Sequence, residues 1–156
     1  IVYIGLTPSI YRCFMILARE YKQLTLKNPP QSMTVLHVIA QGLPLNAVDN
    51  MSRIFGINRT RVAALLGVTP RSLQQLKKND QGATRLSDQI SDRALQLTRL
   101  MNDVTECFGS HEAAVKWMDT PNIGLSDEKP LSLCSSITGM EMVRNSVNRL
   151  KYGMTA

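Results

Sequence analysis

The sequence RTRVAALLGVTPRSLQQLKK, from Arg59 to Lys78, contains the pattern around which the expected fold is arranged. Its first half places apolar residues at helical spacing and ends at Gly67, a residue that adopts a positive φ at little cost. Its second half opens with Thr69, whose hydroxyl can cap a helix, and Pro70, which needs no amide hydrogen in a first turn. The positions expected to face inward are Val62, Ala63, Leu66, Val68, Leu73 and Leu76. This spacing predicts a helix-turn-helix, with a plain pair of packed helices as the alternative.

The outward positions of this motif carry polar and basic side chains. Arginine pairs well with the edge of guanine and glutamine with that of adenine, and both can also reach phosphates. The residues that we predict to contact DNA are Arg59, Arg61, Thr69, Arg71, Ser72, Gln74, Gln75 and Lys78. One such motif makes few contacts, so we expect a homodimer that reads a symmetric DNA site.

Charge is distributed unevenly along the chain, whose formal net charge is +6. Between Met51 and Asn79 no acidic residue occurs, and the basic residues are Arg53, Arg59, Arg61, Arg71, Lys77 and Lys78. Between Asp103 and Glu128 the one basic residue is Lys116, and the acidic residues are Asp103, Glu106, Glu112, Asp119, Asp127 and Glu128. Positive charge is therefore concentrated at the helix-turn-helix, where neutralisation of phosphates would favour binding.

Composition limits the class of protein further. A chain of 156 residues, 44% of them hydrophobic, can bury a core in one domain or in two small ones. It contains no apolar run of about eighteen residues, so we expect no membrane span and a cytoplasmic location. Cys13, Cys107 and Cys134 form no Cys-x-x-Cys pair and are interpreted as buried thiols, and neither His37 nor His111 has ligand spacing, so no metal site is expected. Because the first residue is isoleucine, we expect the natural chain to start earlier.

Helical periodicity extends along the chain and no convincing strand or repeat interrupts it, which predicts an all-α fold. Residues 1–41 are expected to form a helical arm that contributes to dimerisation. Residues 42–86 are expected to form the helix-turn-helix domain. Residues 87–156 are expected to hold a long helix followed by a small C-terminal domain.

Three features organise the C-terminal part. Apolar residues recur at helical steps from about Ser87 until Gly109, which predicts a long amphipathic helix. The stretch from Asp119 to Pro130, DTPNIGLSDEKP, is rich in turn residues and predicts a long ordered loop or a hinge. Thr138, with Glu141 three residues later, resembles a capping box at the start of the last helix.

No constellation typical of an enzyme is present in the sequence. It has no Gly-rich phosphate loop, no Gly-x-Ser-x-Gly elbow and no His-Glu-x-x-His motif, and the neighbouring Asp127 and Glu128 are interpreted as solvated. We therefore predict no catalysis and no cofactor. The acidic C-terminal part, with its single tryptophan, favours a binding module for a protein partner.

The C-terminal half resembles the toxin-binding domain shared by the Xre, MbcA and ParS antitoxins. The stretches that carry the resemblance are FGSHEAAVKWMDTPN, KPLSL and TGMEMVRNSVNRLKYG. The matching positions are Phe108, Gly109, Trp117, Pro121, Asn122, Pro130, Leu131, Gly139, Val143, Leu150, Tyr152 and Gly153. The resemblance continues upstream through the helix-turn-helix to about Gly42. The chain departs from the family pattern where Gly124 replaces a glycine pair and where Cys134 replaces the more usual leucine.

This resemblance implies the antitoxin of a bacterial type II toxin-antitoxin system. Its partner would be a toxin of the RES type, which consumes NAD+, or of the related ParT type, and its N-terminal part would dimerise and bind its own operator. The residues implied in toxin binding are Trp117, Asn122, Arg149, Lys151, Tyr152, Gly153 and Met154. Those from Lys151 onward would form a tail at the entrance of the toxin's active site.

Two other interpretations of the sequence stay open. The chain is alternatively a stand-alone helix-turn-helix transcriptional regulator whose C-terminal domain senses a ligand or another protein. A third interpretation is an interaction protein whose degenerate helix-turn-helix no longer binds DNA. Co-purification with a toxin separates the antitoxin from the stand-alone regulator, and salt-dependent DNA binding separates both from the third class.

Overall fold

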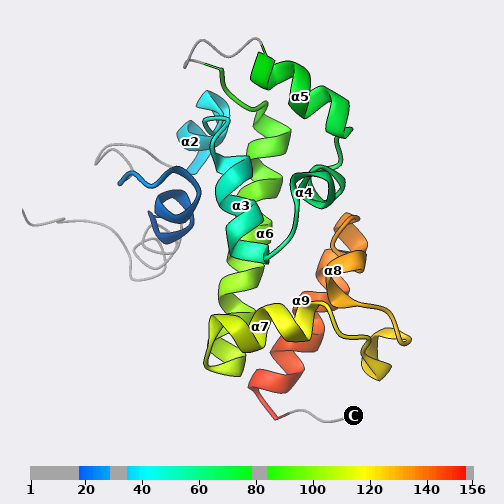
Figure 1. Cartoon of the computed structure of the whole chain (residues 1–156). Helices are drawn as coiled ribbons and strands as arrows, with labels where there is room; N and C mark the ends of the chain where they lie inside the picture. Colours follow the sequence, from blue (N-terminus) through cyan, green and yellow to red (C-terminus); the bar gives the residue numbers. More distant parts are fainter. Residues whose placement is uncertain (1–17, 29–34, 79–83, 154–156) are drawn as a thin grey trace, which may run out of the picture.

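The computed structural model describes residues 18–28, 35–78 and 84–153, and helices make up most of this part of the chain (Figure 1). The elements are α2 (Val35–Gln41), α3 (Ala47–Phe55), α4 (Arg59–Leu66), α5 (Pro70–Lys78), α6 (Asp88–Phe108), α7 (His111–Met118), the 3-10 helix η1 (Ile123–Leu125), α8 (Pro130–Leu133) and α9 (Ile137–Lys151). Residues 18–25 are also helical. These ranges contain no β-strand, only isolated bridges from Pro44 to Arg85 and from Asn122 to Glu128. The expected all-α fold is confirmed.

Helix α6 is the central element of the fold. It begins after Ser87, whose hydroxyl accepts a hydrogen bond from the Ile90 amide at 3.4 Å, and ends at Gly109, where φ is 78°. Elements from both halves of the chain pack against it, namely α2, α3, α4, α7 and α9 (Figure 1). Its buried residues are Ser91, Ala94, Leu95, Leu97, Thr98, Leu100, Met101, Asn102 and Val104. The expected long helix is confirmed. Its buried residues occupy more than one side of the helix, because elements from both halves of the chain pack against it.

Helices α4 and α5 form the expected helix-turn-helix. Gly67 lies between them with φ 72°, and its amide donates to the Ala64 carbonyl at 3.1 Å. The residues expected to face inward are buried or half-buried, and they are Val62, Ala63, Leu66, Val68, Leu73 and Leu76. A cap from Thr69 and the ring of Pro70 start α5 as the sequence predicts.

The C-terminal half is built against the end of α6. Helix α7 folds back on α6, and the rings of Phe108 and Trp117 stack there with centroids 5.3 Å apart. Helices α8 and α9 pack closely at Gly139, where a Cβ atom would lie 2.0 Å from the Leu133 carbonyl oxygen. A glycine at this position therefore permits the approach of the two helices.

The start of α9 differs from the expected capping box. The side chain of Ser136, rather than that of Thr138, accepts the capping hydrogen bond, which comes from the Gly139 amide at 2.9 Å. The helix consequently begins at Ile137, so Thr138 already lies within its first turn. Three hydroxyl residues near this point can act as caps, and the one whose backbone is extended takes the role.

A buried polar network joins the helix at residues 18–25 to α6. The Oε1 atom of Glu20 accepts a hydrogen bond from Asn102 Nδ2 at 2.7 Å, and burial raises the pKa of the Glu20 carboxyl. The second oxygen of Glu20 has no hydrogen-bond partner among the described residues. Much of the arm proposed for residues 1–41 lies outside the described ranges, so its role in dimerisation stays a prediction.

Candidate nucleic-acid interface and C-terminal surface

The exposed face of α5 carries most of the predicted DNA contacts. Arg71, Gln74, Gln75 and Lys78 are exposed, and their spacing of three and four residues puts them on one side of the helix. The opposite side holds the buried Leu73. Helix α5 stands at the rim of the molecule (Figure 1). This geometry leaves arginine and glutamine side chains available to base edges.

Two of the other predicted contacts fix the start of α5. The Thr69 hydroxyl accepts a hydrogen bond from the Ser72 amide at 3.1 Å. It also lies 2.8 Å from the Ser72 hydroxyl, with which it shares a second hydrogen bond. Both hydroxyls are thus engaged within the protein, where they orient the helix that carries the longer side chains.

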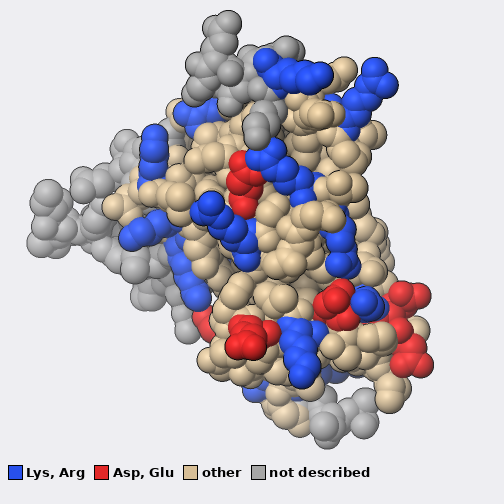
Figure 2. Space-filling view, viewed as in Figure 1, with Lys and Arg blue, Asp and Glu red and all other residues tan. Residues whose placement is uncertain are grey.

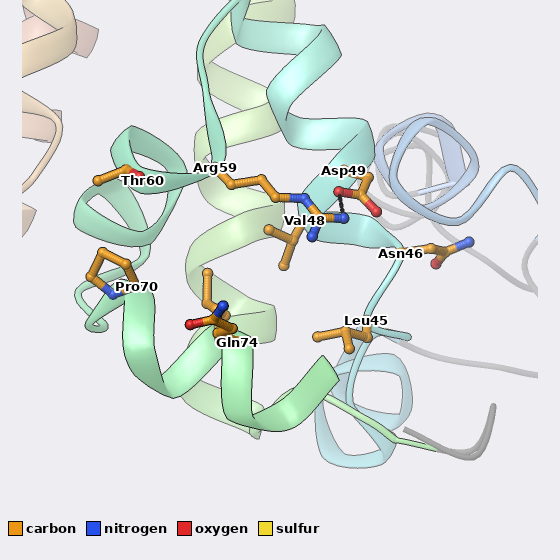
Figure 3. A pocket seen from close by; sticks show the side chains of 9 residues that line it. Leu45, Asn46, Val48, Asp49, Arg59, Thr60, Pro70 and Gln74 are labelled. Carbon is orange, nitrogen blue, oxygen red and sulfur yellow. Dashed lines mark ion pairs between the residues drawn. The ribbon is translucent and has the colours of Figure 1, made fainter. Parts of the chain in front are cut away.

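Arg59 lies at the edge of a cleft between α3, α4 and α5 (Figure 3). The cleft has a volume of about 550 Å³, and its walls include Leu45, Val48, Leu73 and Gln74. The guanidinium of Arg59 turns across it and forms an ion pair with Asp49 of α3. The sequence pattern of α4 does not indicate this pair, because Asp49 belongs to another helix, α3.

Arg61 is exposed and reaches toward the C-terminal half of the molecule. Its guanidinium lies 3.4 Å from the Asp119 carboxylate, which also receives the Lys129 ammonium at 3.3 Å. The hydrogen bond from Lys129, with help from Arg61, lowers the pKa of Asp119. An arginine predicted to contact DNA is therefore already paired with an acidic group of the other half.

Arg93 makes a second connection between the two halves, and no sequence pattern indicates this connection. From α6 its guanidinium donates to the Leu65 carbonyl of α4 and to the Cys134 and Ser135 carbonyls that follow α8. A cleft of about 180 Å³ lies between α4 and α8 beside these contacts, lined in part by Leu65 and Leu131. An arginine within a long helix gives no local signal for such a role.

Trp117 and Asn122, both implied in toxin binding, support the fold of the C-terminal half. Trp117 is half-buried against Phe108. The half-buried Asn122 accepts a hydrogen bond from the Gly124 amide through its side chain at 2.8 Å and caps η1. The loop between α7 and α8 is accordingly an ordered turn.

The end of α9 presents the rest of the implied tail to solvent. Arg149, Lys151 and Tyr152 are exposed, and Tyr152 keeps 69% of its accessible surface. Lys151 is held by an ion pair at 3.1 Å to Glu106 of α6, and this contact lowers the pKa of Glu106 and raises that of Lys151. Gly153 follows in the left-handed conformation, with φ 65°. Met154 lies outside the described residues.

Most of the large exposed apolar side chains belong to the C-terminal half. Within the described ranges they are Leu26 near the start and, in the C-terminal half, Ile123, Ile137, Met142, Leu150 and Tyr152. In Figure 2, most acidic side chains on the visible face lie over the lower part of the molecule, while basic ones extend to the top. Exposed large apolar side chains are thus more numerous in the C-terminal half than in the rest of the described chain.

The described part of the chain shows no group of three or more metal-ligating side chains. No described helix has both the length and the apolar character that a membrane span requires. Burial raises the pKa of the Cys134 thiol to about 12, so this cysteine is an unreactive thiol of the core. Cys107 is half-buried and unbridged, and Cys13 lies outside the described residues.

Comparison with known proteins assigns both halves of the chain. Residues 34–99 match the antitoxin Xre-like helix-turn-helix domain, and residues 103–153 match the antitoxin Xre/MbcA/ParS C-terminal toxin-binding domain. A curated relative, antitoxin Xre of Yersinia enterocolitica, is 27% identical over 117 residues. That alignment covers 74% of this chain and 77% of the relative.

Proposed function

Because this chain belongs to the Xre/MbcA/ParS-type antitoxins, we propose that it neutralises a RES-type, NAD+-consuming toxin and represses its own operon. As an antitoxin the chain would act by binding rather than by catalysis. The observation that carries the proposal is the pairing of an exposed polar and basic face on α5 with exposed apolar side chains in the C-terminal half.

The operator would be read by α5. Its exposed arginine and glutamines, Arg71, Gln74 and Gln75, lie on a helix whose start is fixed by its cap, so the backbone that carries them would already be ordered when the helix meets a DNA groove. A homodimer would place two such helices on a symmetric site and double the contacts. The exposed Lys78 would add a contact to the phosphate backbone.

The toxin would be blocked by the end of α9. The ion pair between Lys151 and Glu106 anchors the last turn, and the exposed ring of Tyr152 projects beyond it. Removal of residues 151–156 should relieve inhibition of the toxin more than it weakens formation of the complex, because docking would use surface outside the tail. A truncated chain that still protects the cell would contradict this role of the tail.

Co-expression with the neighbouring open reading frame tests the proposal as a whole. We expect the two proteins to co-purify, and we expect cellular NAD+ to fall when the toxin gene is expressed without this chain. Absence of both a complex and toxicity would favour the stand-alone regulator. A complex without loss of NAD+ would retain the antitoxin and reject the RES type of toxin.

A further inference from the structure

Ile123 is the most exposed large hydrophobic residue in the described part of the chain, with 88% of its surface accessible. It opens η1 in the loop between α7 and α8. The next apolar residue in this turn, Leu125, is 2% exposed and anchors the loop in the core, and η1 packs against α9. One of two neighbouring apolar side chains is therefore buried, while the other points into solvent.

The loop that presents Ile123 is held by a set of hydrogen bonds centred on Asn122. The Asn122 amide donates to the Glu128 carbonyl at 3.1 Å, and the Asn122 carbonyl accepts from the Leu125 and Asp127 amides at 2.9 and 3.0 Å. The Asn122 side chain accepts the Gly124 amide as well. Such a turn loses little conformational entropy when a partner binds, which favours affinity.

Backbone strain in the same loop indicates that its shape is specified. Ser126 and Asp127 are consecutive residues in the left-handed region, with φ of 59° and 60°, and neither is glycine. A serine in the left-handed region costs roughly 1 kcal/mol or more and persists where the surrounding structure imposes it, whereas aspartate tolerates this region. Here the two left-handed residues close the turn that carries Ile123.

Acidic side chains flank this exposed isoleucine. Asp127 and Glu128 are exposed, and neither takes part in the ion pairs found among the described residues. Asp119, in contrast, is neutralised by Arg61 and Lys129. The corner around Ile123 therefore combines one protruding apolar group with uncompensated negative charge.

We propose that Ile123, Asp127 and Glu128 form a docking site for the toxin that is separate from the tail. Ile123 would enter an apolar pocket on the toxin whose rim carries lysine or arginine. The occupant is the toxin because this corner lies within residues 103–153, which match a toxin-binding domain, and the negative charge of Asp127 and Glu128 then requires a basic rim on the toxin. The inference rests on the proposed antitoxin function, and it adds to that function the site and the chemistry of docking.

The decisive variant is Ile123→Asp, compared with Gln89→Asp as a control for the added charge. Gln89 is exposed in the first turn of α6, outside both the toxin-binding match and the arm at residues 1–41. The probe is a catalytically inactive form of the toxin encoded beside this chain, immobilised for binding kinetics. We expect Ile123→Asp to dissociate about tenfold faster or more, as for a central interface residue, and the control to match the wild type.

The acidic rim is tested by the double variant Asp127→Asn, Glu128→Gln. Asparagine keeps the left-handed turn at position 127, so the shape of the loop is retained. We expect slower association and a weaker dependence on salt, with little change in dissociation, because rim charges act mainly on the encounter. Unchanged kinetics in both variants would overturn this docking site, whereas failure of the wild-type chain to bind the toxin would overturn the proposed function itself.

Discussion

Arg61 and Asp119 are 58 positions apart in the sequence, yet their side chains meet at 3.4 Å between α4 and the C-terminal half. An arginine suited to a phosphate is thus paired with a carboxylate of the toxin-binding domain. Arg59, two residues earlier in α4, is paired in the same way with Asp49. Both arginines must exchange a carboxylate for a phosphate if they are to contact DNA, so these carboxylates oppose DNA binding.

The variant Asp119→Asn should bind operator DNA more tightly than the wild type. It removes the charge that competes for Arg61, and we expect a gain of roughly two- to fivefold, the scale of an exposed ion pair. The slope of the logarithm of the binding constant against the logarithm of the salt concentration should become steeper by about one unit, the amount expected for one additional phosphate contact. Fluorescence anisotropy with labelled operator over a series of salt concentrations measures both quantities.

A second acidic residue separates this effect from a general change in charge. Asp127→Asn removes the same charge from an exposed position that does not contact Arg61. An equal gain in both variants would show that Asp119 acts only through the overall field. The combination of Arg61→Met with Asp119→Asn should lose the gain, as a double-mutant cycle requires if the two residues interact.

Alanine at Arg71 or Gln75 should weaken operator binding by roughly 1–3 kcal/mol if the side chain makes a paired base contact. Both residues are exposed on the recognition face of α5, so the fold should be unaffected. Arg99→Ala, which removes an exposed arginine from α6, serves as the control for lost charge. Unchanged affinity in both α5 variants would favour the degenerate helix-turn-helix.

Replacement of Gly139 by alanine should lower the free energy of unfolding by roughly 1–3 kcal/mol, the range of an overpacked core. The added Cβ would lie 2.0 Å from the Leu133 carbonyl oxygen, so α8 and α9 must separate. At Gly109, in contrast, an added Cβ meets nothing within 4 Å, and asparagine tolerates its positive φ. Urea unfolding of Gly139→Ala and Gly109→Asn should therefore show a loss in the first variant and less than about 1 kcal/mol in the second.

The variant Glu20→Gln should be more stable than the wild type at neutral pH. Burial raises the pKa of Glu20 above its ordinary value of 4.5, so its charged form is disfavoured in the folded chain. The wild type then loses stability as pH rises through the raised pKa, whereas glutamine keeps the acceptor for Asn102 without a charge. Unfolding measured from pH 4 to pH 8 should show the two curves diverging with rising pH, and parallel curves would contradict the assignment.

Local chemistry was enough to predict most helix ends. The helix start near Ser87, the left-handed Gly67 and the stop at Gly109 depend on residues within one turn of the chain, so the sequence alone identifies them. The predicted capping residue of α9 is wrong, because Ser136 and Thr138 are both good caps and local preference does not choose between them. Periodicity likewise predicted the exposed face of α5.

The contacts that join distant elements could not be predicted. The partners of Arg59 and Arg61 depend on how α3 and the loop after α7 approach α4, which no local pattern encodes. The sequence around Trp117 resembles the family pattern, but only the structure shows that the Trp117 ring packs on Phe108. The exposure of Ile123 could not be predicted either, because the sequence pattern around an isolated isoleucine in a loop does not show whether its side chain is buried or exposed.

The contacts of Arg93 bear on how such an antitoxin can be engineered. This side chain, from α6, donates hydrogen bonds to carbonyl groups of α4 and of the turn after α8. The two halves are therefore held together by contacts between residues that are far apart in the sequence. A hybrid that grafts another C-terminal domain after Gly109 would retain Arg93 but alter the carbonyl positions that it requires. Exchange of toxin specificity therefore demands that the graft include a matched surface of α4.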